Sequence, residues 1–242
     1  MITMGGIVRS VSPALHGYLS AVSNREYEAF PPRRIVASKP IHKKLKSLFA
    51  SRKGYFIEAG ANNGVKGSNT YYLEEYCGWT GLLIEPIPHR FVECRQARRG
   101  SHSVHCGLVS DTYSKEYVEL VYMDLMSMVR DRVGALDLST QLEKSLRTKR
   151  YGDDLTGTTF FAPARTLCSV LQDHGFPQVD FLSLDVEGHE LDVLKGNDFE
   201  RCSPRYILVE DWDKAGVGEL LATKGYEVEE RMGDRDTLYR LA

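Results

Sequence analysis

Short apolar runs alternate with stretches of helical periodicity along most of this chain of 242 residues. The runs have the length of buried β-strands, and the stretches between them repeat their apolar residues at helical spacing. Strands are expected at 55–58, 80–85, 103–109, 179–185 and 204–210, helices at 68–76, 88–99, 165–174, 187–194 and 217–224, and a closing pair of strands at 226–230 and 237–241. Since strand–helix–strand units of this length join parallel strands, we expect an α/β fold with a Rossmann-like, doubly wound, mostly parallel sheet and an antiparallel closing strand.

The N-terminal part of the chain does not follow this alternation. Residues 1–38 show no sustained period, and several prolines interrupt them. Within residues 39–53, Ile41, Leu45 and Phe49 share one face of a predicted helix whose lysines lie off that face. We therefore expect residues 1–53 to be an N-terminal extension with a basic amphipathic helix, and residues 54–242 to be the main domain. The basic face is expected either to be solvated while the helix covers the sheet edge, or to attract an anionic substrate or surface.

A second departure from the alternation lies at residues 111–160. Within it, residues 116–123 favour an extra strand, 126–136 and 139–150 favour helices, and 151–159 favour a loop. A long insertion at the carboxyl edge of a parallel sheet is usually functional. We therefore interpret residues 111–160 as a substrate-facing cap.

Composition excludes several classes of protein. Hydrophobic residues make up 42% and charged residues 26% of a chain with net charge −2, which argues against a protein whose whole surface binds nucleic acid. No apolar run approaches the roughly 18 residues needed to span a bilayer, and the first residues lack the pattern of a signal peptide. The five cysteines are odd in number and form no C-x-x-C pair, which favours reduced thiols and a cytoplasmic location over disulfides or a zinc site.

The stretch at 55–64 is the strongest candidate for a binding site. An apolar run ends in Glu58, and Gly60 and Gly64 follow before the next predicted helix. A buried strand, a glycine turn and a helix N-terminus form a cradle for nucleotide-type ligands. The spacing is E-x-G-x-x-x-G rather than the G-x-G-x-x-G of dinucleotide-binding loops, which disfavours a nicotinamide-dependent oxidoreductase and favours S-adenosylmethionine. The alternative is an ordinary strand–turn–helix corner.

Two further strand ends extend this hypothesis. Glu85 ends the second strand, where an acid commonly receives the ribose hydroxyls of a bound nucleoside. Leu108 ends the third strand, where it is expected either to pack against the adenine or to belong to the core. For Glu85 the alternative is a solvated strand terminus.

Four segments together resemble the FkbM-type S-adenosylmethionine-dependent methyltransferases. They are residues 56–64, 68–71, 81–86 and 179–196, and the resemblance extends over about residues 54–232. It implies a seven-stranded methyltransferase fold and methyl transfer to a hydroxyl oxygen of a small-molecule or glycan acceptor, either a sugar or a secondary metabolite. The cofactor-binding residues that it implies are Glu58, Gly60, Ala61, Asn62, Gly64, Asn69, Glu85, Pro86, Leu108 and Asp185.

The acceptor hydroxyl must lose a proton, and two devices for this are visible in the sequence. His189 lies four residues after Asp185, where a neutral imidazole could act as the general base. Asp185, Glu210 and Asp211 end neighbouring strands and could bind Mg²⁺ as three oxygen ligands. This arrangement is similar to that of metal-dependent sugar O-methyltransferases acting on macrolide antibiotics. The alternatives are a structural histidine, and acids that orient the base or the methionine amino group without a metal.

A different class of function also remains open. A binding or trafficking module could keep the fold without catalysis, and it would be expected to have a degraded cofactor loop. Glu58, Gly60, Gly64 and Glu85 are all present, so the enzyme is the preferred hypothesis.

Overall fold

The computed structural model describes residues 37–123, 127–129, 157–175, 177–211 and 214–242. They belong to one compact unit, Ile35–Ala242. The helix expected at 139–150, most of the one expected at 126–136 and most of the loop expected at 151–159 lie outside the described residues.

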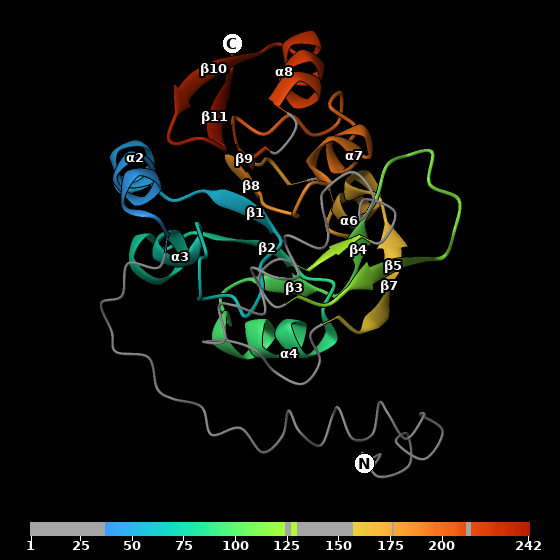
Figure 1. The fold of residues 1–242 in the computed structure, drawn as a ribbon. Helices are drawn as coiled ribbons and strands as arrows, with labels where there is room; N and C mark the ends of the chain where they lie inside the picture. The colour runs from blue at the N-terminus through green and yellow to red at the C-terminus, as the bar shows by residue number, and fades with distance from the viewer. Residues whose placement is uncertain (1–36, 124–126, 130–156, 176, 212–213) are drawn as a thin grey trace. The chain divides into compact units, whose positions relative to one another are not determined.

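A seven-stranded sheet forms the centre of this unit, in the order β10-β11-β9-β8-β1-β2-β3 (Figure 1). Its strands are β1 (Tyr55–Ala59), β2 (Thr80–Ile84), β3 (His102–Val104), β8 (Phe181–Leu184), β9 (Tyr206–Glu210), β10 (Tyr226–Arg231) and β11 (Asp236–Leu241). β11 runs antiparallel to both of its neighbours, and the other neighbouring strands are paired in parallel. The predicted doubly wound sheet with an antiparallel closing strand is therefore confirmed.

Helices cover both faces of the sheet because its strands are apolar on both sides. The side chains of β1 alternate, so that Ile57 and Ala59 join one core cluster while Phe56 joins the other. The first cluster includes residues of α6 (Leu167–Asp173), α7 (Glu190–Lys195) and α8 (Lys214–Thr223), and the second includes residues of α2 (Lys39–Phe49), α3 (Tyr71–Cys77) and α4 (Pro88–Ala97). Figure 1 shows the two groups on opposite sides of the sheet.

The predicted amphipathic helix corresponds to α2, whose Lys44 pairs with Glu229 and Glu230 of edge strand β10 (2.9 Å each). Its buried residues are Ile41, Leu45 and Phe49, as the periodicity indicated. The Phe49 ring lies 5.4 Å from that of Phe181 on β8 and 5.5 Å from that of Tyr206 on β9. α2 therefore packs on the face of the sheet over its central strands, where it removes large aromatic side chains from water.

A second sheet of four strands has the order β4-β7-β5-β6. It consists of β4 (Gly107–Leu108), β5 (Tyr117–Val121), β6 (Met128–Val129) and β7 (Thr159–Arg165). Only β5 agrees with the sequence prediction. The single strand expected at 103–109 is divided between the two sheets, because β3 pairs with β2 whereas β4 pairs with β7. β6 lies where a helix was expected, and β7 was not predicted.

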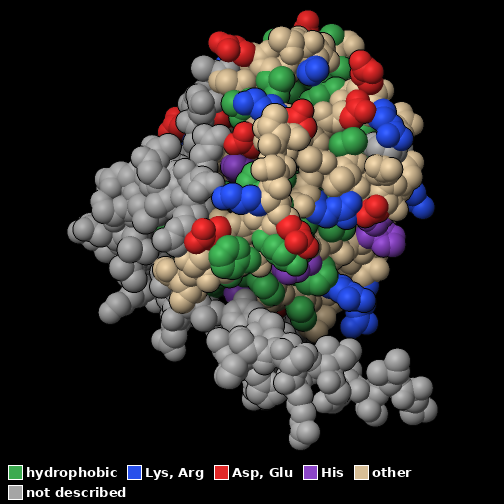
Figure 2. Space-filling model, turned by 90° about the vertical axis from the view of Figure 1, so that its right-hand side faces the viewer, with side chains coloured by type: hydrophobic (Ala, Val, Ile, Leu, Met, Phe, Trp, Pro, Cys, Tyr) green, Lys and Arg blue, Asp and Glu red, His purple; other side chains and the backbone are tan. Residues whose placement is uncertain are grey.

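The described surface carries charged side chains of both signs. On the face shown in Figure 2, acidic and basic side chains are interspersed, in keeping with the net charge of −2. Among the helices described, none combines the length and apolar character that crossing a membrane requires.

Candidate functional site

A cavity of about 300 Å³ lies at the carboxyl ends of the central strands, where parallel α/β sheets bind their ligands. The segments after β1, β2 and β8 contribute Gly60, Glu85 and Asp185 to its wall. The second sheet contributes Leu120 and Val129. The volume lies at the lower end of the range for small-molecule sites, and the wall combines apolar side chains with a few polar groups.

The turn after β1 requires glycine. Gly60 has φ +83°, and a Cβ atom placed on it would lie 1.7 Å from the backbone oxygen of Asp185. The next bend uses Asn62, whose φ is +48°. The side-chain oxygen of Asn63 accepts hydrogen bonds from the backbone N–H groups of Val65 (3.1 Å) and Lys66 (2.8 Å). The cradle predicted from the sequence is therefore a tightly bonded loop that passes directly over the end of β8.

Glu58 holds this loop from beneath. Its buried carboxylate accepts hydrogen bonds of 2.7 Å from the Ser68 hydroxyl, the Asn69 backbone N–H and the Thr70 hydroxyl. A guanidinium nitrogen of Arg98 lies 3.6 Å from the same carboxylate. Glu58 borders the cavity, and these contacts also make it a support of the loop at residues 60–70; its contact with a cofactor stays a prediction.

Glu85 follows β2 directly, and its buried side chain lines the cavity. One carboxylate oxygen accepts the backbone N–H of Asn62 (2.6 Å) and the other that of Ile87 (2.8 Å). Burial raises its pKa to about 7, while the two backbone hydrogen bonds oppose the shift. Each oxygen has a further lone pair, so the carboxylate can also accept hydrogen bonds from hydroxyl groups of a ligand in the cavity.

Most of the other expected binding residues also border the cavity. Asn62, Pro86 and Leu108 line it, as does Asn69, whose amide donates a 3.0 Å hydrogen bond to the Ser183 hydroxyl. Leu108 is also part of the core, which agrees with one of its two expected roles; contact with the adenine stays a prediction. Two expected residues belong instead to the inside of the loop. The Ala61 side chain is packed in the core, and Gly64 closes the turn by donating its N–H to the Ala61 oxygen (2.8 Å) while its Cα faces Arg98.

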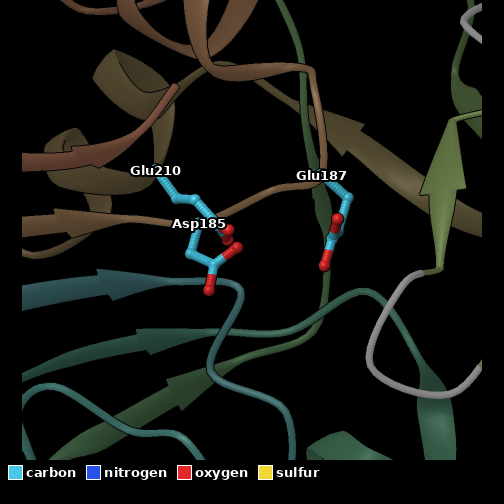
Figure 3. A group of neighbouring side chains, drawn as sticks. All are labelled: Asp185, Glu187 and Glu210. Atoms are coloured by element: carbon cyan, nitrogen blue, oxygen red, sulfur yellow. The ribbon is translucent and has the colours of Figure 1, made fainter. Parts of the chain in front are cut away.

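Three carboxylates meet at the β8 side of the cavity. Asp185, Glu187 and Glu210 each place an oxygen within 4.8 Å of the others, and Figure 3 shows the side chains of Asp185 and Glu210 turned toward each other. The register explains this pair, because Leu184 of β8 lies opposite Val209 of β9. Burial and the nearby carboxylates of Glu210 and Glu187 raise the pKa of Asp185 well above its ordinary value. Burial, followed by the charge of Glu210, raises the pKa of Glu187 to about 8.

Asp211, the third expected metal ligand, does not belong to this group. Successive side chains of an extended strand point to opposite faces, so Asp211 is turned away when Glu210 faces the cavity. Burial raises the pKa values of Glu190 and Tyr239, and the charge of the buried Asp211 carboxylate adds to both shifts. Glu187 takes its place.

The segment between β8 and α7 is a turn, not the helix start that the sequence suggested. Glu187 and Gly188 have φ of +55° and +91°, and α7 begins only at Glu190. The Glu190 carboxylate accepts the backbone N–H groups of Val186 (3.1 Å) and Gly188 (3.0 Å) and thereby fixes the turn. His189 occupies the N-cap of α7 and lines the cavity, with Nδ1 3.3 Å from a carboxylate oxygen of Asp192.

Comparison with known families agrees with this geometry. Residues 58–231 match the family described as "Methyltransferase FkbM domain". The chain belongs to the FkbM methyltransferase family. The match begins at Glu58, and every described residue that lines the cavity lies within it. The resemblance expected from the sequence motifs is therefore confirmed.

Individual proteins similar to this FkbM methyltransferase are also methyltransferases. A protein named methyltransferase sdnD from Sordaria araneosa is 27% identical over 199 residues, which cover 72% of this chain and 74% of the relative. A TehB-like SAM-dependent methyltransferase from Corynebacterium glutamicum has a TM-score of 0.43 at 11% identity, covering 95% of this chain and 96% of its own. A precorrin-6y C5,15-methyltransferase from Geobacter metallireducens has a TM-score of 0.42 at 10% identity, covering 88% and 92%. Both TM-scores are below 0.5, so the fold is assigned from the strand order of this chain.

Arg98 and Glu187 were not assigned to this site from the sequence. Arg98 is almost fully buried, and its guanidinium donates to Glu74 (2.9 Å), the Gly64 oxygen (2.8 Å) and the Thr70 hydroxyl (3.0 Å). It follows directly after α4, and adjacent Arg99 is exposed, so periodicity alone does not distinguish the two. Glu187 was assigned to a helical first turn, although the glycine after it indicates a possible break.

Proposed function

We propose that this FkbM methyltransferase transfers the methyl group of S-adenosylmethionine to a hydroxyl oxygen of a sugar or glycan. The observation that carries the proposal is the arrangement of the cavity. On one side lies Glu85, a buried hydrogen-bond acceptor for a nucleoside. On the other side lie His189 and the three carboxylates of Asp185, Glu187 and Glu210.

The nucleoside side fits the cofactor. Glu85 can accept hydrogen bonds from two adjacent ribose hydroxyls, and its backbone contacts to Asn62 and Ile87 keep the carboxylate in position. Leu108 offers an apolar surface to the base. S-adenosylmethionine supplies an electrophilic methyl group on a sulfonium, whose positive charge favours a cavity with an acidic wall.

The acidic side fits an acceptor with several hydroxyl groups. Asp185, Glu187 and Glu210 can each accept hydrogen bonds, and a sugar offers several neighbouring O–H donors. Two or more such bonds would fix which hydroxyl faces the methyl group, and correct alignment contributes strongly to displacement reactions.

His189 is the candidate general base. When its Nδ1–H faces Asp192, the lone pair of Nε2 is available for a proton. The acceptor oxygen forms its bond to the methyl carbon as the carbon–sulfur bond breaks, and the hydroxyl proton moves to the imidazole. A group in this role typically contributes about 10²–10⁴-fold to the rate.

A divalent cation would be held by Asp185, Glu187 and Glu210. Two oxygens bound to one cation at about 2.1–2.4 Å can lie at most about 4.2–4.8 Å apart, which agrees with the observed group. The charge of the cation would favour the ionised forms of Asp185 and Glu187, whose pKa values are raised, and it would favour the alkoxide form of a bound hydroxyl.

The proposal is tested by incubating the protein with methyl-labelled S-adenosylmethionine and separate pools of monosaccharides, oligosaccharides and small alcohols. We expect label in a carbohydrate pool, and none when Asp185→Asn replaces the wild type. Label only in a non-carbohydrate pool would overturn the sugar assignment. Turnover that is unchanged after EDTA treatment would overturn the cation.

A further inference from the structure

The charged side chains of the cavity wall are mostly acidic, and Lys66 is an exception. The ionisable residues that border the cavity include the acids Glu85, Asp185, Glu187 and Glu210. Among the described residues that line it, Lys66 alone has a lysine or arginine side chain. A lysine in the cavity wall offers a charged donor to an anionic part of a bound ligand.

The position of Lys66 is fixed by its loop. The Asn63 side chain accepts the Lys66 backbone N–H (2.8 Å), and Glu58 holds the following residues at Ser68 and Asn69. The Asn69 amide in turn contacts Ser183 on β8. The loop residues that carry Lys66 are therefore tied to the β8 side of the cavity.

This side is opposite the nucleoside contacts. In the sheet, β1 lies between β8 and β2, so Ser183 and Glu85 are on different sides of β1. If the ribose binds at Glu85 and the base at Leu108, the amino-acid part of the cofactor would extend away from β2 toward the segment 66–69. That part carries an α-carboxylate. Among the described residues of the cavity wall, Lys66 supplies the lysine or arginine charge that can pair with this carboxylate.

We propose that Lys66 binds the α-carboxylate of the methionine part of the cofactor and thereby selects for cofactors that have an amino-acid tail. The inference deepens the proposed function and rests on it. The contact is a charge-assisted hydrogen bond from an ammonium group to a carboxylate at a partly exposed site. A single contact of this type corresponds to roughly tenfold in affinity.

Calorimetric titration with two ligands tests the inference without any methyl acceptor. S-adenosylhomocysteine carries the amino-acid tail, whereas 5′-methylthioadenosine has the same nucleoside without it. We expect Lys66→Gln to weaken binding of S-adenosylhomocysteine about tenfold and to change binding of 5′-methylthioadenosine less than about twofold. Lys66→Arg keeps the charge and should retain most of the affinity. The matched control is Lys46→Gln, at an exposed lysine of α2.

The outcomes separate this inference from the proposed function. Equal affinities of wild type and Lys66→Gln for S-adenosylhomocysteine, or an equal loss for both ligands, would overturn the role of Lys66 while leaving the cofactor in place. Failure of the wild type to bind either ligand would overturn the proposed cofactor, and the role of Lys66 with it. A thermal unfolding midpoint equal to that of the wild type would show that Lys66→Gln is folded.

Discussion

The guanidinium of Arg98 lies 3.6 Å from the carboxylate of Glu58 beneath the cofactor loop, and the two side chains are only 1% and 5% exposed. Arg98 follows α4, while Glu58 lies in β1, so this pair connects a helix on one face of the sheet to a central strand. The guanidinium of Arg98 also pairs with a second carboxylate, that of Glu74, at 2.9 Å. The loop at residues 60–70 therefore rests on a buried ionic network rather than on apolar packing alone.

Replacement of Arg98 should strongly destabilise the protein. Arg98→Met leaves the Glu58 and Glu74 carboxylates without their cation and removes donors to the loop. We expect the free energy of unfolding, measured by urea denaturation, to fall by about 3–5 kcal/mol. The matched control is Arg99→Met, because Arg99 is the next residue and is exposed.

A double variant can show whether Arg98→Met loses stability because of the unpaired charge of Glu58 or because of the altered shape of the side chain. If the buried charge of Glu58 causes the loss, adding Glu58→Gln to Arg98→Met should recover part of the stability. A loss in Arg98→Met no larger than that in Arg99→Met would contradict the structural role given to Arg98.

Two glycines of the cofactor loop should respond differently to alanine. Both have positive φ, but a Cβ on Gly60 would lie 1.7 Å from the Asp185 backbone oxygen, whereas a Cβ on Gly67 meets no atom within 4 Å. Gly67→Ala should cost only the left-handed backbone strain of about 1–2 kcal/mol. Gly60→Ala must also move the loop or the end of β8, so we expect a larger loss of stability and loss of S-adenosylhomocysteine binding by calorimetry. Similar effects of the two substitutions would show that the close approach at Gly60 is unimportant.

The sequence was sufficient to predict the central fold. Strong apolar runs such as residues 179–185, separated by helical periods, correspond to the strands of the seven-stranded sheet, because burial on both faces leaves few other conformations for them. The second sheet was predicted less well. β6 and β7 contain few alternating apolar positions, and their pairing depends on contacts between residues distant in sequence.

The site was predicted in part for a similar reason. Glu85 and the Asp185–Glu210 pair could be predicted because they follow from strand ends and strand neighbours, which the apolar runs define. Asp211 was chosen although side-chain alternation along β9 turns it away from the cavity. Glu187 and Arg98 depend on a left-handed turn and on a buried ionic network, and neither has a periodic signal in the sequence.

The free energy of unfolding should decrease as the pH rises, and part of this decrease should depend on Glu85. Burial raises its pKa from 4.5 to about 7, so the folded state holds this proton more tightly than the unfolded state does. The contribution is fully present below about pH 4.5 and is lost as the pH rises through about 7. Between pH 5 and pH 8 the free energy of unfolding should fall in both proteins. The fall in Glu85→Gln should be smaller than that in the wild type by about 1–3 kcal/mol. The control, Glu75→Gln at an exposed position, should retain the wild-type slope, and an unchanged slope in Glu85→Gln would contradict the assignment.

Substitution of His189 should separate catalysis from cofactor binding. His189→Ala removes the proposed proton acceptor but none of the nucleoside contacts, so turnover at saturating substrate should fall by about 10²–10⁴-fold. The affinity for S-adenosylhomocysteine, measured by calorimetry, should stay within about twofold of the wild type, since no loop hydrogen bond of Glu58 or Glu85 is lost. The control is His102→Ala, at an exposed histidine of edge strand β3, which should keep both activity and affinity. Undiminished turnover in His189→Ala would exclude the imidazole as the base and would leave the carboxylates of Asp185, Glu187 and Glu210 as the groups to test next.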